Sequence, residues 1–105
     1  MTQTRRVFVP DYQVVRDGVL LGTLARTGSD QPWWLGDFDA APGFESFRPV
    51  FERERELLEA DDDLDAWGRA WDELSAGMVL EPLDGREPIT EFLLHIDGRQ
   101  ASWRY

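Results

Sequence analysis

Asp-Gly pairs constrain the fold of this 105-residue chain more than any other feature. Both residues tolerate the positive φ angles of a two-residue type I′ turn, so an Asp-Gly pair between apolar runs predicts a β-hairpin. The first hairpin is expected to join residues 12–16 to residues 19–26. Pro82 and Pro88 flank the middle pair and predict a loop in its place. The three pairs stand at residues 17–18, 84–85 and 97–98.

The last pair predicts a second hairpin, which joins residues 89–96 to residues 99–105. A two-residue turn pairs Leu94 with Ala101 and gathers apolar side chains on one face of the hairpin. The opposite face is expected to be polar and to point away from the helices, so we interpret His95 as a surface histidine. That polar face carries Glu91, His95, Gln100 and Arg104.

Between the hairpins, the spacing of apolar residues changes to that of a helix. Helices are predicted over residues 46–60 and from residue 64 onward, with Asp63 capping the second helix and Gly77 closing it. A short strand over residues 78–81 leads into the last hairpin. The chain is therefore expected to form a single α+β domain over its full length. Its elements are two strands, two helices and three strands, in one antiparallel sheet with both helices packed on one face.

Residues 28–43 are interpreted as a long loop between the first hairpin and the helices, and they hold the most unusual composition. The loop is predicted to be ordered, with Phe38 and one indole buried and the other indole partly exposed beside a carboxylate. An exposed indole of this kind could anchor an Arg or Lys side chain of a partner. The alternative is that both indoles cover the core as a lid. The residues proposed for partner binding here are Trp33, Trp34, Asp37 and Asp39.

The charge distribution points to a protein partner with a basic face. The chain carries 21 acidic against 11 basic residues, a formal net charge of −10. Residues 44–77 hold eleven acids and four arginines, which gives −7. Glu52, Glu56 and Glu59 form an acidic ridge on the first predicted helix, and we assign them to partner binding. No basic stripe suited to phosphates accompanies them, so a nucleic-acid partner is not expected.

Missing residue types exclude many kinds of chemistry. The chain has no Cys, no Lys and one His, which excludes thiol nucleophiles, thiolate metal sites, P-loop lysines and pyridoxal Schiff bases. A Ser-His-acid site remains arithmetically available, but no Gly-x-Ser-x-Gly elbow frames a serine. Asp37 and Asp39 are interpreted as turn residues, and the aspartates at 61, 62, 63 and 65 as capping residues. No metal, cofactor or catalytic residue is therefore assigned. The serines are Ser29, Ser46, Ser75 and Ser102.

These features together predict a small acidic cytoplasmic protein that serves as a protein-interaction module. The alternative is a small-ligand-binding protein or enzyme that uses the loop carboxylates, with or without His95. No apolar run approaches the ~20 residues of a membrane span, and the first residues lack the apolar core of a signal peptide. A weak homodimer through Leu93, Val15 and Leu20 is a further expectation.

Small bacterial proteins from actinobacteria resemble this chain over nearly its whole length. In them, a Pro-Trp loop separates an N-terminal hairpin from helices and a C-terminal hairpin. The resemblance implies the same order of elements, and it implies no activity, cofactor or catalytic residue. It is carried by two runs, DQPWWLGDFDAAPGFESFRPVFERE and FLLHIDGRQASWRY.

Overall fold

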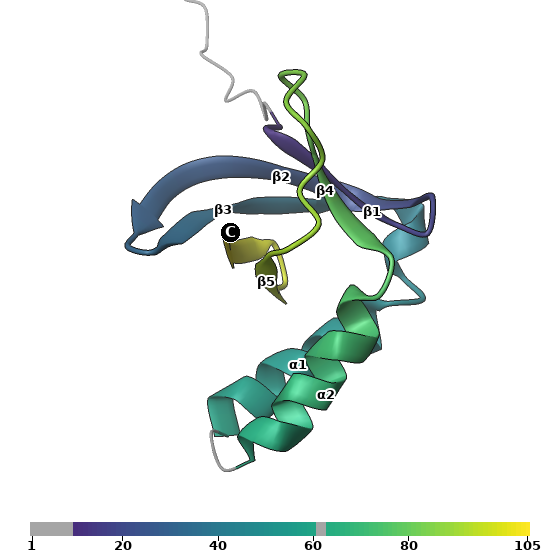
Figure 1. The fold of residues 1–105 in the computed structure, drawn as a ribbon, viewed down its shortest axis with the longest axis vertical. Helices are drawn as coiled ribbons and strands as arrows, with labels where there is room; N and C mark the ends of the chain where they lie inside the picture. Colours follow the sequence, from purple (N-terminus) through teal and green to yellow (C-terminus); the bar gives the residue numbers. More distant parts are fainter. Residues whose placement is uncertain (1–9, 61–62) are drawn as a thin grey trace, which may run out of the picture.

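A computed structural model of the protein describes residues 10–60 and 63–105. Its strands form one antiparallel sheet in the order β4-β1-β2-β3-β6-β5, and two helices lie between β3 and β4 in the chain (Figure 1). The α+β class with a single antiparallel sheet is therefore confirmed. The elements are β1 (Tyr12–Arg16), β2 (Val19–Asp30), β3 (Trp33–Ala40), a 3-10 helix η1 (Pro42–Phe44), α1 (Arg48–Ala60), α2 (Leu64–Ser75), β4 (Met78–Pro82), β5 (Leu93–Asp97) and β6 (Gln100–Arg104).

The first Asp-Gly pair forms the predicted hairpin turn, whereas the last hairpin turns at Gly98 and Arg99, because Asp97 belongs to β5 and pairs with Gln100. Asp17 and Gly18 have φ angles of 50° and 80°, and Arg16 pairs with Val19, as the sequence predicts. In the last hairpin Leu94 pairs with Trp103 rather than with Ala101, so the register differs by two residues from the prediction. A shift of two residues keeps every side chain on its original face, which is why the apolar face was predicted although its pairs were not.

The predicted long loop over residues 28–43 is wrong, because most of it is strand. β2 continues to Asp30, and the chain then turns back as β3, which pairs with β2 on one side and with β6 on the other. Trp34 and Phe38 face the core, and Gly36 lies between them on the same face. A methyl group at Gly36 would collide with the Ala25 carbonyl oxygen and the Trp103 ring. The glycine thus permits the close approach of three strands.

The core forms where the sheet curls on itself. Tyr12 on β1 and Trp103 on β6 belong to strands that are separated in the sheet by β2 and β3, yet their ring centroids lie 5.9 Å apart. The Tyr12 hydroxyl lies 2.7 Å from that of Tyr105. Burial and then this hydrogen bond raise the pKa of Tyr12 above its ordinary value. Aromatic contacts extend the core from Phe38 through Phe44 to Phe51.

The helices α1 and α2 pack side by side as one pair, and the pair extends away from most of the sheet (Figure 1). α1 also packs against β5. The Asp63 carboxylate accepts a hydrogen bond from the Ala66 amide at 2.9 Å, so the predicted cap of α2 is confirmed. The neighbouring Asp61 and Asp62, also interpreted as capping residues, lie outside the described residues. Gly77, at a φ angle of 75°, follows the end of α2. No helix within the described residues is long and apolar enough to cross a membrane.

Candidate functional site

A buried acid on α1 organises the most unusual polar site of the molecule. Glu54 follows Phe51 by three residues and precedes Leu58 by four, so the helical repeat places it on the inner face of α1. Its side chain is fully buried. The Trp67 indole Nε1 on α2 donates a hydrogen bond to Glu54 Oε2 at 2.6 Å, and His95 Nδ1 on β5 lies 2.9 Å from Oε1. One carboxyl group therefore links both helices to the sheet.

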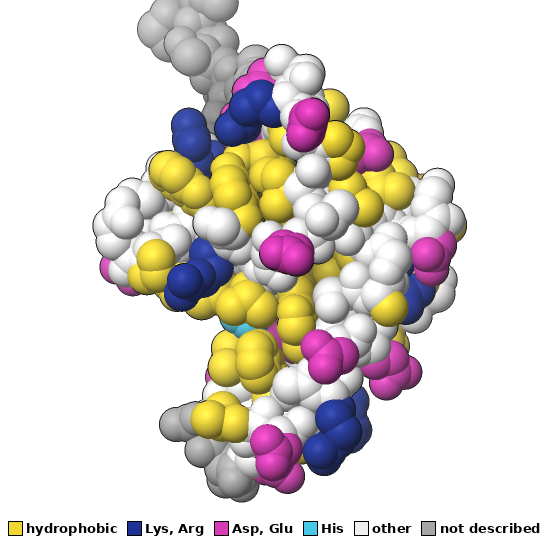
Figure 2. Space-filling model, in the orientation of Figure 1, with side chains coloured by type: hydrophobic (Ala, Val, Ile, Leu, Met, Phe, Trp, Pro, Cys, Tyr) yellow, Lys and Arg dark blue, Asp and Glu magenta, His cyan; other side chains and the backbone are white. Residues whose placement is uncertain are grey.

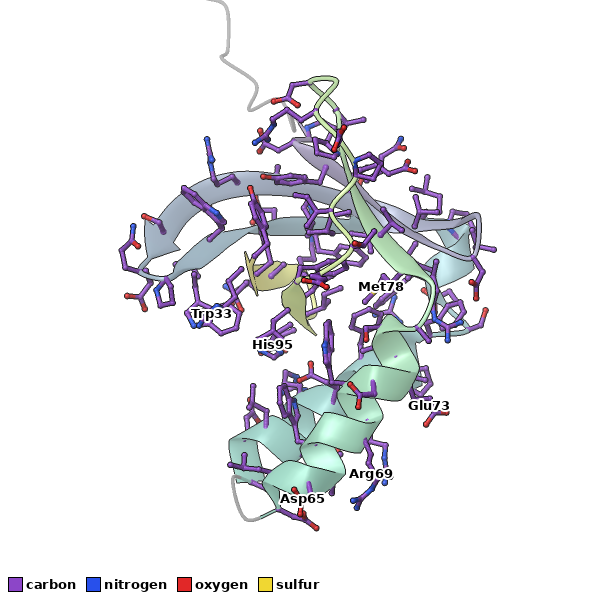
Figure 3. The ribbon with its side chains drawn as sticks, in the orientation of Figure 1. Trp33, Asp65, Arg69, Glu73, Met78 and His95 are labelled. Atoms are coloured by element: carbon purple, nitrogen blue, oxygen red, sulfur yellow. The ribbon has the colours of Figure 1, made fainter. Side chains whose placement is uncertain are left out.

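His95 is the second member of this site, and its prediction as a surface histidine facing away from the helices is wrong. Its side chain is only 15% exposed, because α1 packs against the face of β5 that was expected to be open. The Trp33 ring lies 5.1 Å from the imidazole with an angle of 44° between the planes. Figure 3 shows Trp33 and His95 close together between the sheet and the helical pair. The Arg104 guanidinium in turn lies 5.8 Å from the Trp33 ring.

A hollow of about 350 Å³ adjoins His95 on this face of the sheet. Strand pairing places Ser102 opposite His95 on one side and opposite Leu35 on the other, so three neighbouring strands contribute one row of side chains. Residues directly opposite each other in a sheet share a face. The hollow is lined by Leu35, Arg55, Leu58, Glu59, His95, Asp97, Gln100, Ala101 and Ser102.

Arg55 brings the positive charge to this hollow. Its Nη1 lies 3.2 Å from Glu59, and its Nε lies 3.7 Å from Asp97. These carboxylates, Asp97 above all, raise the pKa of the Arg55 guanidinium, which keeps it protonated. The Nε atom is buried and has no hydrogen-bond partner in the part of the chain that the structure describes. The guanidinium is thus held between Glu59 and Asp97 at the edge of the hollow.

The residues assigned to partner binding do not form one cluster. Trp33 and Trp34 are both half-buried and lie on opposite faces of β3. The Arg26 guanidinium lies over the Trp34 ring, 4.6 Å from its centroid. Phe38 is buried as predicted, but the two indoles are equally half-buried, rather than one buried and the other partly exposed. On β3, Asp37 is half-buried and Asp39 is exposed. Glu52, Glu56 and Glu59 are exposed on α1.

Glu54 was not predicted as a site residue, although the sequence contains a signal for it. The apolar spacing of α1 places residue 54 on the same face as Phe51 and Leu58. An acid in such a position must be paired with a donor, because a buried carboxyl group without hydrogen bonds is strongly destabilising. Trp67 was assigned to the core, and its ring is indeed half-buried against the core, but its indole N–H has this additional role.

The geometry leaves one nitrogen of the histidine available for chemistry. Nδ1 is occupied by Glu54, whereas Nε2 has no hydrogen-bond partner among the described residues. A carboxyl group bound to one ring nitrogen orients an imidazole for use of the other.

No three metal-binding side chains lie close together within residues 10–60 and 63–105. Comparisons with protein-family models, curated proteins and solved structures find no match to this chain.

Proposed function

We propose that the protein is an interaction module that binds a protein partner with a basic surface through its helical pair. The observation that carries this proposal is a set of exposed carboxylates on both helices that outnumber the arginines among them. Within the described part of the chain, none of these side chains makes a hydrogen bond or salt bridge. The set consists of Glu52 and Glu56 on α1 and of Asp65, Asp72 and Glu73 on α2.

The arginines near these carboxylates leave an acidic surplus. Arg48 is bound to Glu45 at 2.7 Å, and Arg55 is bound to Glu59 and Asp97, so these guanidinium groups are already engaged. Residues 44–77 retain a net charge of −7 by composition. Figure 2 shows acidic side chains spaced over the helical pair. A surplus of one sign on a projecting element accelerates association with an oppositely charged partner and favours that partner over others.

The helical pair suits this role better than the two tryptophans of β3. Arg26 lies 4.6 Å from the Trp34 ring, and Arg104 lies 5.8 Å from the Trp33 ring. Each indole thus already has a cation from its own chain, and an incoming Arg or Lys would have to displace it. The exposed carboxylates of the helical pair make no hydrogen bond or salt bridge among the described residues, so a partner cation can bind them without breaking one.

Capture of proteins from a lysate of the source organism by the immobilised full chain tests this proposal. We expect a captured protein with a basic isoelectric point, whose recovery falls as salt is raised. A variant that carries Glu52→Gln, Glu56→Gln, Asp72→Asn and Glu73→Gln should recover at least ~4-fold less of it, since each contact is worth about 0.2–1 kcal/mol.

A matched control removes the same charge elsewhere. The variant with Asp30→Asn, Asp39→Asn, Glu87→Gln and Glu91→Gln alters four exposed acids outside the helices and should recover the partner as well as wild type does. An equal loss of partner recovery in both variants would mean that binding depends on net charge and not on the helical pair, which would contradict the proposal. Equal recovery by the helix variant and wild type, or a partner that resists salt, would contradict the proposal.

A further inference from the structure

We propose that Ser102, His95 and Glu54 form an acyl-transfer site that hydrolyses small esters in the hollow beside His95. Ser102 is the nucleophile, His95 is the general base, and Glu54 is the positioning residue. This activity is separate from the proposed partner binding, because the site lies between α1 and the sheet, whereas the partner-binding carboxylates are exposed on the helices.

The three groups stand in the order of a Ser-His-acid triad, in which the contact between the acid and the histidine is formed. Glu54 binds Nδ1 of the imidazole at 2.9 Å, which leaves Nε2 to serve the serine. Ser102 is the direct cross-strand partner of His95, and such partners on one face have Cβ atoms about 4.5–5.5 Å apart. The Ser102 hydroxyl and His95 Nε2 make no hydrogen bond with each other or with any other described residue, so both are available to a substrate. The bond between catalytic serine and histidine commonly tightens only when substrate is bound.

Neighbouring side chains complete the site. Trp67 donates to the second oxygen of Glu54 at 2.6 Å, so the positioning carboxyl group is itself fixed. The Gln100 amide lines the same hollow and can donate to an oxyanion. Leu35 and Leu58 supply apolar surface for the acyl chain. A volume of about 350 Å³ and this lining favour an ester with a short apolar acyl group.

The reaction proceeds in two balanced steps. The Ser102 hydroxyl gives its proton to His95 Nε2 while its oxygen attacks the carbonyl carbon of the ester. The bond to the leaving alcohol then breaks, the alcohol oxygen takes the proton from Nε2, and an acyl-serine remains. In the second step, water gives a proton to Nε2 and attacks the acyl carbon. Release of the carboxylic acid returns that proton to Ser102 and restores the site.

Hydrolysis of 4-nitrophenyl butyrate by the full chain measures the activity. Ser102→Ala and His95→Gln should each lower kcat at least ~10²-fold. Ser46→Ala, at an exposed serine before α1, is the matched control and should keep the wild-type rate. Glu54→Gln should lower kcat per folded molecule, with the folded fraction measured by circular dichroism, which a general loss of structure would not do. If Ser102→Ala keeps the activity and His95→Gln loses it, the histidine catalyses hydrolysis without the serine, and the proposal is overturned.

A covalent probe tests the wild-type protein without any substitution. A fluorophosphonate reacts with serines activated by a general base, and we expect a single adduct, which peptide mass spectrometry places on Ser102. Prior treatment with the probe should abolish ester hydrolysis. No adduct on Ser102, or equal labelling of Ser29, Ser46 and Ser75, would overturn the assignment. Because these readouts do not involve a protein partner, their failure leaves the partner-binding proposal to be decided by the capture experiment.

Discussion

Replacement of Glu54 by alanine is expected to lower the free energy of unfolding by about 3–5 kcal/mol, because removing one partner from a buried polar pair leaves the others without hydrogen bonds. The indole N–H of Trp67 and Nδ1 of His95 both lose the carboxyl group that they contact at 2.6 and 2.9 Å. The helical pair also loses a polar connection to β5. Urea-induced unfolding followed by circular dichroism measures the change.

Glu56→Ala is the control for this substitution, since it removes an exposed glutamate from the same helix. Its effect should stay within about 0.5 kcal/mol, as is usual for surface positions. If Glu54→Ala cost no more than Glu56→Ala, the buried network would not hold the helices to the sheet. The structural account of the site would then be wrong.

Replacement of Trp103 by alanine is expected to cost about 3–5 kcal/mol, the range for removal of a large aromatic side chain from a core. Trp103 is fully buried, packs edge-on against Tyr12, and fills the space that Gly36 leaves open. Its indole Nε1 is buried without a hydrogen-bond partner among the described residues. The side chain therefore stabilises the fold by its size and not by its N–H group.

Trp103→Phe separates these two properties. Phenylalanine keeps much of the ring and removes an unpaired N–H, whose burial costs about 1–3 kcal/mol. We expect Trp103→Phe to cost less than half as much as Trp103→Ala in the same unfolding experiment. Equal losses would show that the indole N–H makes a stabilising contact, which would contradict the packing described for this core.

Local signals in the sequence predicted the parts of the fold that depend on neighbouring residues. The turn at Asp17-Gly18 and the cap at Asp63 involve atoms only a few residues apart, and both are confirmed. β3 was missed because Gly36 and the flanking Pro32 are poor strand residues. That strand pairs with β2 through a turn at Gln31 and Pro32 that has no Asp-Gly signal, and with β6, more than sixty residues further along the chain. Such long-range pairing leaves no local pattern.

The candidate site was missed for a similar reason. His95 and Glu54 are 41 residues apart, and only the packing of α1 against β5 brings them together. The alternation of the last hairpin correctly placed His95 on the face opposite Trp103. It could not show that a helix would cover that face. A single histidine and an acid on the apolar side of a helix were the two available clues.

The tautomer of His95 tests the central claim about the site most directly. Because the chain contains one histidine, a long-range ¹H–¹⁵N spectrum of labelled protein shows a single imidazole. At a pH where the ring is neutral, a proton on Nδ1 and a free Nε2 are expected, since Nδ1 donates to the Glu54 carboxylate. Glu54→Gln should abolish this preference. A wild-type ring protonated on Nε2, as in free imidazole side chains, would contradict the account, because Glu54 would then hold the proton and Nε2 could not act as a base.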